Sequence, residues 1–420
     1  MIDDSSKYRA NFLNQYTKIP NKILETLNSR YSEEYEGVRH CIGLIIVNLL
    51  NSGEVAYSRN KNFYTKNRTK HYTFANMLNA LEITVADGYA VKLQTGYHRR
   101  GDEKGRSSTL KAGPRLDEFD QPGAMDLDVE SLPLLMVDDR PVFEGDDLNL
   151  VKLRVDKEKQ ESRAFADRRD RVYDEALKLN REYWNTMEID TRYIDSKSKC
   201  FNHVGLTRIF KQGLMGRWFQ KGEMSYQQLS STERAKLLLN GETVVEIDYS
   251  SMHPHILYAW EREQCPDDFY EIIVHECGCS RFAAKDVALI AINASSYLSF
   301  VGGINNNKKE TIRANRNRAK PEPILYDELK QCGMTPKEVV DAIKIAHPVI
   351  SKYIYNASAN KLMLVESDIM TAVLLKLMEL GIPALPEHDS VIVPSRYEDT
   401  ARQIMHDIYR EYTGFRVVIE

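Results

Sequence analysis

The feature that most constrains the fold is the mixture of short β-branched strands and long helices in residues 200–420. A β-branched run, VVEID (244–248), predicts a strand, and apolar spacing predicts helices over 281–301, 336–346 and 361–380. These strands and helices do not alternate regularly, as they would in a doubly wound parallel sheet. We therefore expect an α+β fold in this half of the chain.

The strand predicted at 244–248 ends on a charged residue, Asp248, and the chain continues as YSSMHPHILYAW. A second acid, Asp389, lies in LGIPALPEHDSVIVPS (380–395), where apolar runs flank a polar centre and predict a β-hairpin. Each aspartate alone is explained by a turn or a strand end, where Asp is common. A hairpin that presents an aspartate beside a strand ending in another aspartate could also hold two divalent cations about 4 Å apart.

One segment, SRFAAKDVALIAINASSYLSFVGG (280–303), predicts a single long helix. Its spacing places Arg281 and Lys285 one turn apart on one face, and Asn293 and Tyr297 at further turns of nearly the same face. Cations at this spacing suit the phosphates of a nucleoside triphosphate, with the amide and the ring toward the sugar and base. The alternative is an amphipathic helix with two solvated cations, which the spacing leaves open.

The N-terminal part of the chain combines two helices with a basic hairpin. Residues 35–53 and 71–89 have helical apolar spacing, Thr73 caps the second helix, and residues 90–113 predict two short strands around a loop. This order resembles a winged helix, in which the second helix and the wing contact nucleic acid. A protein-interaction domain or a solvated loop would have the same pattern. The basic residues of the loop are His98, Arg99, Arg100, Lys104 and Arg106.

Charge is distributed unevenly along the chain. Between residues 117 and 147, eleven Asp or Glu residues accompany a single basic residue, Arg140, so this stretch has a net charge of −10. The whole chain has a net charge of −4, and the remainder therefore carries +6. A mildly basic remainder is compatible with a polyanionic partner.

Composition places the chain among globular proteins outside the membrane. No apolar stretch approaches the length of a membrane span, and MIDDSSKYRANF lacks the charged-then-apolar order of a secretory signal. Six cysteines in 420 residues do not make a disulfide framework, which favours a reducing cytoplasm. A zinc site at Cys265, His275, Cys277 and Cys279 is the less favoured interpretation, because the paired C-x2-C spacing is missing.

Four segments together resemble the motifs of polynucleotide polymerases. DYSSMHPHI (248–256) is similar to motif A of family B and family A DNA polymerases, and EHDSVIV (387–393) resembles motif C of family A DNA polymerases and single-subunit phage RNA polymerases. Arg281 and Lys285 resemble the start of motif B on the fingers helix. GLMGRWFQKGEMSYQQLSSTER (213–234) is similar to the Gly–Arg segment ahead of motif A. All four segments occur in the family A order.

The resemblance implies a right-hand palm and fingers with a metal-dependent site. Asp248 and Asp389 would be the catalytic residues and would bind two Mg²⁺ or Mn²⁺ ions, with the main-chain carbonyl of Tyr249 as a further ligand. Lys285 and Arg281 would bind the incoming triphosphate.

The resemblance also implies contacts to the sugar and to nucleic acid. His253 falls five residues after Asp248, where DNA polymerases place a bulky side chain against the ribose 2′ position, so deoxynucleotides are the expected substrates. Arg217, Gln228 and His388 would contact a DNA primer–template, with RNA as the alternative.

Two features depart from the family A pattern. The aromatic–glycine spacing expected after the motif B lysine is absent, because Leu289 and Asn293 occupy the fourth and eighth positions. Gly213 stands where an acid often precedes the Gly–Arg pair. The core is therefore expected to be minimal and divergent.

These patterns predict three regions: a winged-helix-like nucleic-acid-binding domain (1–112), an acidic linker with a helical, thumb-like part (113–200), and a polymerase-like palm and fingers core (201–420). The expected function is a metal-dependent nucleotidyltransferase, a template-directed DNA polymerase that extends a 3′ end. A template-independent terminal transferase, an RNA polymerase and a non-catalytic DNA-binding replication or regulatory protein with a degenerate palm are the alternatives. The oligomeric state stays open.

Overall fold

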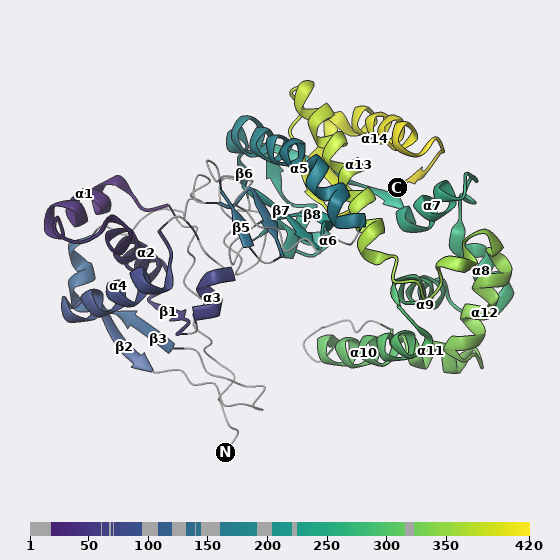
Figure 1. Cartoon of the computed structure of the whole chain (residues 1–420), viewed down its shortest axis with the longest axis horizontal. Helices are drawn as coiled ribbons and strands as arrows, with labels where there is room; N and C mark the ends of the chain where they lie inside the picture. The colour runs from purple at the N-terminus through teal and green to yellow at the C-terminus, as the bar shows by residue number, and fades with distance from the viewer. Residues whose placement is uncertain are drawn as a thin grey trace, which may run out of the picture.

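The computed structural model of the chain describes residues 18–59, 61–66, 69, 71–94, 108–119, 132–138, 140–143, 160–190, 204–220, 225–315 and 323–420. Over these residues the protein is mixed α+β, which confirms the predicted class, with extensive helix and small sheets (Figure 1). Buried apolar side chains form two separate cores, one drawn from Ile19 to Phe119 and the other from Leu134 to Val417.

The first core lies between helices and a three-stranded antiparallel sheet of order β1-β3-β2. The predicted helices are confirmed: α2 ends at Gly53, whose φ of 71° suits glycine, and the Thr73 side chain caps α4 by accepting from the N–H of Asn76. The two strands predicted in 90–113 are also confirmed. The predicted basic residues of the connecting loop, from His98 to Arg106, lie outside the described residues. The elements are α1 (Asn21–Arg30), α2 (Glu36–Ser52), β1 (Glu54–Tyr57), α3 (Lys61–Lys66), α4 (Phe74–Ala86), β2 (Ala90–Gln94), β3 (Ser108–Ala112) and η1 (Pro114–Glu118).

The second core begins at a four-stranded sheet of order β5-β4-β7-β8, in which β4 and β7 are parallel and the other pairs antiparallel. The helical part expected within 113–200 is present as α5 and two short helical turns that follow it. Trp184 from those turns packs edge-on against Trp218 of β8, which joins the helix to the sheet. The elements are β4 (Leu135–Val137), β5 (Arg140–Val142), α5 (Gln160–Lys178), η3 (Leu179–Tyr183), η4 (Trp184–Thr186), β7 (Leu206–Lys211) and β8 (Leu214–Gln220).

A second sheet of order β11-β12-β10-β9-β6, with β13 also paired to β10, carries the strand that contains Asp248. The predicted strand and the predicted hairpin are both confirmed, as β10 and as β11–β12. The elements are β6 (Ile189–Asp190), η5 (Tyr226–Gln228), α6 (Ser231–Arg234), β9 (Leu238–Leu239), β10 (Glu242–Ser250), β11 (Leu385–Glu387), β12 (Ser390–Pro394) and β13 (Val418–Ile419).

Helices cover this sheet and extend beyond it. The helices predicted at 336–346 and 361–380 are confirmed as α12 and α13, and α13 packs on β8 and on α14. No helix in the described part of the chain has the length and apolar character needed to cross a membrane. The elements are α7 (Met252–Trp260), α8 (Phe269–Cys277), α9 (Arg281–Asn293), α10 (Tyr297–Asn315), α11 (Leu325–Gln331), α12 (Pro336–Ala346), η6 (Pro348–Tyr353), α13 (Ala359–Glu379), η7 (Ser395–Tyr397) and α14 (Glu398–Thr413).

The prediction of a single helix over 280–303 is wrong, because the chain breaks between α9 and α10. The C-terminal carbonyls of α9 accept hydrogen bonds from a neighbouring loop, with Tyr355 N–H donating to Ala291 at 2.9 Å and Ala357 N–H to Ala294 at 2.8 Å. Ser296 then caps the next helix by accepting from the N–H of Ser299. The tertiary contact therefore ends α9 where apolar spacing alone would continue it.

Candidate active site

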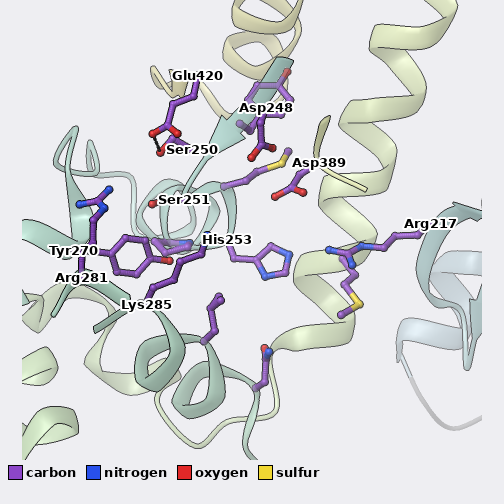
Figure 2. A pocket seen from close by; sticks show the side chains of 16 residues that line it. Arg217, Asp248, Ser250, Ser251, His253, Tyr270, Arg281, Lys285, Asp389 and Glu420 are labelled. Atoms are coloured by element: carbon purple, nitrogen blue, oxygen red, sulfur yellow. Dashed lines mark hydrogen bonds between the residues drawn. The ribbon is translucent and has the colours of Figure 1, made fainter. Parts of the chain in front are cut away.

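The register of β10 and β12 brings the two predicted carboxylates together. Asp248 lies opposite Ser390, so Asp389, the residue before Ser390, sits at the hairpin tip beside it. The main chain ties the two segments here, because Tyr249 N–H donates to the carbonyl of Asp389 at 3.3 Å. Figure 2 shows Asp248 and Asp389 on the same wall of one pocket.

The chain turns sharply at Ser251, just after β10 ends at Ser250, and this turn places His253. Ser251 has a φ of 55°, a left-handed conformation that lets strand β10 pass directly into helix α7. Pro254 is tolerated in the first turn of α7 because the N–H it lacks would have no partner within the helix. His253 is thereby held in the first turn, where its side chain lines the pocket.

The two carboxylates oppose each other's ionisation. The pKa of Asp248 rises from 3.8 to about 7, first because the walls of the pocket limit its solvation and second because the charge of Asp389 repels it. Burial likewise raises the pKa of Asp389, and the nearby charge of Glu366 adds to the effect. A divalent cation between the two carboxylates would remove both penalties.

The donors present fit a hard divalent cation such as Mg²⁺ or Mn²⁺, which prefers oxygen ligands. Asp248 and Asp389 supply the carboxylates. Tyr249 could contribute only its main chain, because its ring is buried and its hydroxyl donates to the carbonyl of Met405 at 2.7 Å. The described residues contain no group of three or more His, Cys, Asp or Glu arranged to hold a metal. A cation here would therefore complete its coordination with main-chain, water or substrate oxygens.

Helix α9 supplies the positive side of the pocket, opposite the carboxylates (Figure 2). Lys285 is exposed to the pocket, and its charge lowers the pKa of Asp248. Arg281 is held at the entrance by Asp268, whose two oxygens accept from one guanidinium nitrogen at 2.6 Å each. The cavity of about 380 Å³ is within the usual range of about 300–1,000 Å³ for small-molecule sites.

A buried charge network closes the pocket on the side of α13. Arg217 on β8 donates two hydrogen bonds of 2.6 Å to the two oxygens of Glu366, and His253 Nε2 lies 2.7 Å from one of these oxygens. The Glu366 side chain is 0% exposed. Burial disfavours its charge, but the hydrogen bonds from His253 and Arg217 prevail and keep the pKa of Glu366 below its usual value.

Not all predicted site residues converge on this pocket. Asn293 lines it, at the last turn of α9. The prediction for Tyr297 is corrected: it begins α10 and contacts Phe300 and Tyr355 instead, because the helix breaks before it.

Two further predicted nucleic-acid contacts, Gln228 and His388, lie outside the pocket lining. Gln228 is exposed at the end of the short turn η5. His388 sits at the hairpin tip with a φ of 57° and packs edge-on against Phe219. Burial, followed by the charge of Arg217, lowers the pKa of His388.

Two acidic residues of the site are not among the site residues predicted from the sequence. Glu366 falls on the buried stripe of α13 between Leu362 and Met370, so a charge at an apolar position was the signal that could have identified it. Glu420 exchanges main-chain hydrogen bonds with Asp248 at 2.9 and 3.1 Å and accepts from Ser250 Oγ at 2.7 Å. No local pattern marks that contact, because it depends on the pairing of β13 with β10.

The group considered for zinc does not assemble around a common point. Cys265, Cys277 and Cys279 are buried, whereas the side chain of His275 is 86% exposed. Burial raises the pKa of the Cys277 thiol to about 12, which favours the neutral form over the thiolate that zinc requires.

Comparison with protein-family models and with curated proteins found no match to this chain.

Proposed function

We propose that the chain is a metal-dependent nucleotidyltransferase that extends the 3′ end of a nucleic acid, as a template-directed DNA polymerase using deoxynucleoside triphosphates. One observation carries the proposal. Asp248 and Asp389 lie together on one wall of a pocket whose opposite wall presents Lys285 and Arg281. A cation site facing two basic side chains suits a substrate that is a polyphosphate bound to divalent metal.

In this reaction the 3′-hydroxyl of a primer loses its proton to water, its oxygen bonds to the α-phosphorus of the triphosphate, and the bond from that phosphorus to the bridging oxygen of pyrophosphate breaks. Asp248 and Asp389 would hold the two cations, which would lower the pKa of the attacking hydroxyl and neutralise the leaving pyrophosphate. Lys285 would hold the phosphates through charge-assisted hydrogen bonds. Arg281 could share one guanidinium between Asp268 and the phosphates, because its five N–H donors exceed what Asp268 uses.

The sugar and the primer would contact the end of the pocket that His253 and Arg217 line. His253 projects from the first turn of α7, five residues after Asp248, where its ring would exclude a ribose 2′-hydroxyl. Arg217 lines the same pocket and would contact the primer end. A pocket lined by charged and polar side chains suits a nucleotide better than an apolar ligand.

The N-terminal elements support a nucleic-acid partner. The chain order α2, β1, α3, α4, β2, β3 with sheet order β1-β3-β2 is the order expected of a winged helix. In the proposed role, α4 and the basic segment between β2 and β3 would bind duplex DNA near the growing end.

The test is extension of a labelled primer, with and without template, by each dNTP and NTP in the presence of Mg²⁺ or Mn²⁺. Wild-type protein should extend the templated primer with complementary dNTPs, and Asp248→Asn and Asp389→Asn should lower the rate by at least about a thousandfold. Glu242→Gln is the matched control, because Glu242 lies on the same strand but pairs with Arg396 at the surface.

Absence of extension by the wild type under all of these conditions would refute the proposal. Extension that persists in both aspartate variants would refute the assignment of the site. Extension without template would replace the polymerase by a terminal transferase, and a preference for NTPs would replace it by an RNA polymerase.

A further inference from the structure

Glu366 joins two pocket residues that come from different parts of the fold. Arg217 is on β8, His253 is on α7, and Glu366 lies between them on α13. In Figure 2 the Arg217 and His253 side chains point toward one another across the pocket. Three hydrogen bonds of 2.6, 2.6 and 2.7 Å converge on the one carboxylate.

Because Glu366 is buried, its carboxylate needs hydrogen-bond donors from the protein. An ionised carboxylate that is 0% exposed must be satisfied by donors, because an unpaired buried charge costs several kcal/mol. Arg217 satisfies it with two nearly parallel bonds, the arrangement that most restricts the guanidinium. The remaining acceptor capacity of one oxygen is used by His253.

The consequence for His253 is a fixed ring. An exposed imidazole on the first turn of a helix would rotate freely about its side-chain torsions, but a short hydrogen bond to a buried carboxylate removes that freedom. The histidine side chain is only 12% exposed, yet it lines the pocket five residues after Asp248. A ring that cannot rotate excludes a hydroxyl group from its neighbourhood, whereas a ring that can rotate would make room.

We propose that Glu366 is a positioning residue for sugar selectivity: its carboxylate holds the His253 ring in the space that a ribose 2′-hydroxyl would need. Arg217 completes this arrangement by holding the carboxylate itself. The inference rests on the proposed function and adds a determinant that lies outside the four polymerase-like segments. It makes discrimination against ribonucleotides a property of the carboxylate–imidazole pair and not of the size of His253 alone.

The test measures single-nucleotide incorporation of a dNTP and of the matching rNTP, with kcat and KM obtained separately for each. The quantity of interest is the ratio of kcat/KM for dNTP to kcat/KM for rNTP. Glu366→Gln keeps the volume of the side chain but weakens both charge-assisted contacts, and it should lower this ratio by about tenfold or more. Most of the change should appear as a lower KM for the rNTP.

Asp368→Asn is the matched control. Asp368 lies two residues further along α13 and pairs with Arg208 and Arg168, so its loss removes a comparable ion pair away from the pocket. This variant should lose stability and keep the wild-type ratio. His253→Phe provides a second test that leaves the buried carboxylate in place: it preserves the bulk of the ring but removes the hydrogen bond, and it should also lower the ratio.

The outcomes separate this inference from the function on which it rests. No incorporation of either nucleotide by the wild type would overturn both. A wild type that discriminates, together with unchanged ratios in folded Glu366→Gln and in His253→Phe, would overturn the positioning role and leave the polymerase intact. If Glu366→Gln does not fold, His253→Phe decides alone. A wild-type ratio in His253→Phe would overturn the positioning role, because the bulk of the ring without its hydrogen bond would then be enough to exclude ribonucleotides.

Discussion

Replacing Asp248 by asparagine should stabilise the metal-free protein. In the wild type this carboxylate stands beside Asp389 and near Glu246 and Glu420, and each of these charges opposes its ionisation. Asparagine has nearly the same volume and carries no charge, so Asp248→Asn removes the repulsion without opening a cavity. A change at the centre of the proposed catalytic site would thus increase stability while it abolishes the proposed activity.

The magnitude follows from the pKa of Asp248, which rises from 3.8 to about 7. A shift of roughly three pKa units would correspond to about 4 kcal/mol for a fully buried group. Asp248 is exposed to the pocket, and solvent screens most of such an interaction. We therefore expect Asp248→Asn to raise the free energy of unfolding by about 1 kcal/mol. For a domain of about 200 residues this is an increase of about 2–4 °C in Tm.

The effect depends on pH in a definite direction. Below the unfolded pKa of 3.8 the aspartate is protonated in the folded and the unfolded chain, so it costs no stability. As the pH rises toward 7 the unfolded chain ionises more readily than the folded one, and the wild type loses stability that the variant retains. The difference in Tm should therefore be smaller at about pH 5 than at about pH 8.

The assay is thermal unfolding in chelator across this pH range, followed by titration with Mn²⁺. At a concentration about ten times its Kd, Mn²⁺ should stabilise the wild type by about 1.4 kcal/mol and leave Asp248→Asn nearly unchanged. Glu242→Gln on the same strand serves as the control for loss of a surface carboxylate. A variant no more stable than the wild type at about pH 8, or one whose advantage is larger at about pH 5, would refute the electrostatic account.

Three further results are expected. Lys285→Ala should raise the KM for the incoming triphosphate by about tenfold or more and lower Tm only slightly, because the side chain is exposed and solvent screens its attraction to Asp248; steady-state kinetics and calorimetry check this. Leu374→Ala in the buried face of α13 should lower the free energy of unfolding by about 2–5 kcal/mol in denaturant titration, with no change in sugar selectivity. Arg99→Glu with Arg100→Glu should weaken duplex binding, and the slope of log K against log salt should fall by up to about two, as measured by fluorescence anisotropy.

Local pattern was sufficient for much of the site. The β-branched run of β10 and the polar tip between two apolar runs predicted both strands, and antiparallel pairing then placed Asp248 beside Asp389. Thr73 likewise predicted the start of α4, because a side-chain cap is a local interaction. Such features are encoded within a few residues of sequence.

The features that sequence reasoning missed depend on contacts between distant segments. Glu366 is 149 residues from Arg217 and 113 from His253, and no periodicity links positions so far apart. The break before Tyr297 also depends on a distant segment. A loop more than 50 residues later donates a hydrogen bond to the carbonyl of Ala291 at the end of α9. The serines before Tyr297 are typical residues for the start of a helix. The apolar spacing on both sides of them nevertheless predicted one continuous helix.

The placement of the carboxylates argues for a cation independently of any motif. Strand β10 has a partner on each side at the level of Asp248: the β11–β12 hairpin brings Asp389, and the segment after β13 brings Glu420. A slip of one residue in either register would turn these side chains to the other face. The register that buries the apolar residues of β10 therefore also brings the carboxylates of Asp248, Asp389 and Glu420 close together. Their repulsion lowers the stability of the metal-free fold, and Lys285 is the cation that most reduces it for Asp248. A divalent cation would turn that repulsion into attraction, which makes the stability gain on Mn²⁺ binding the most direct test of the site.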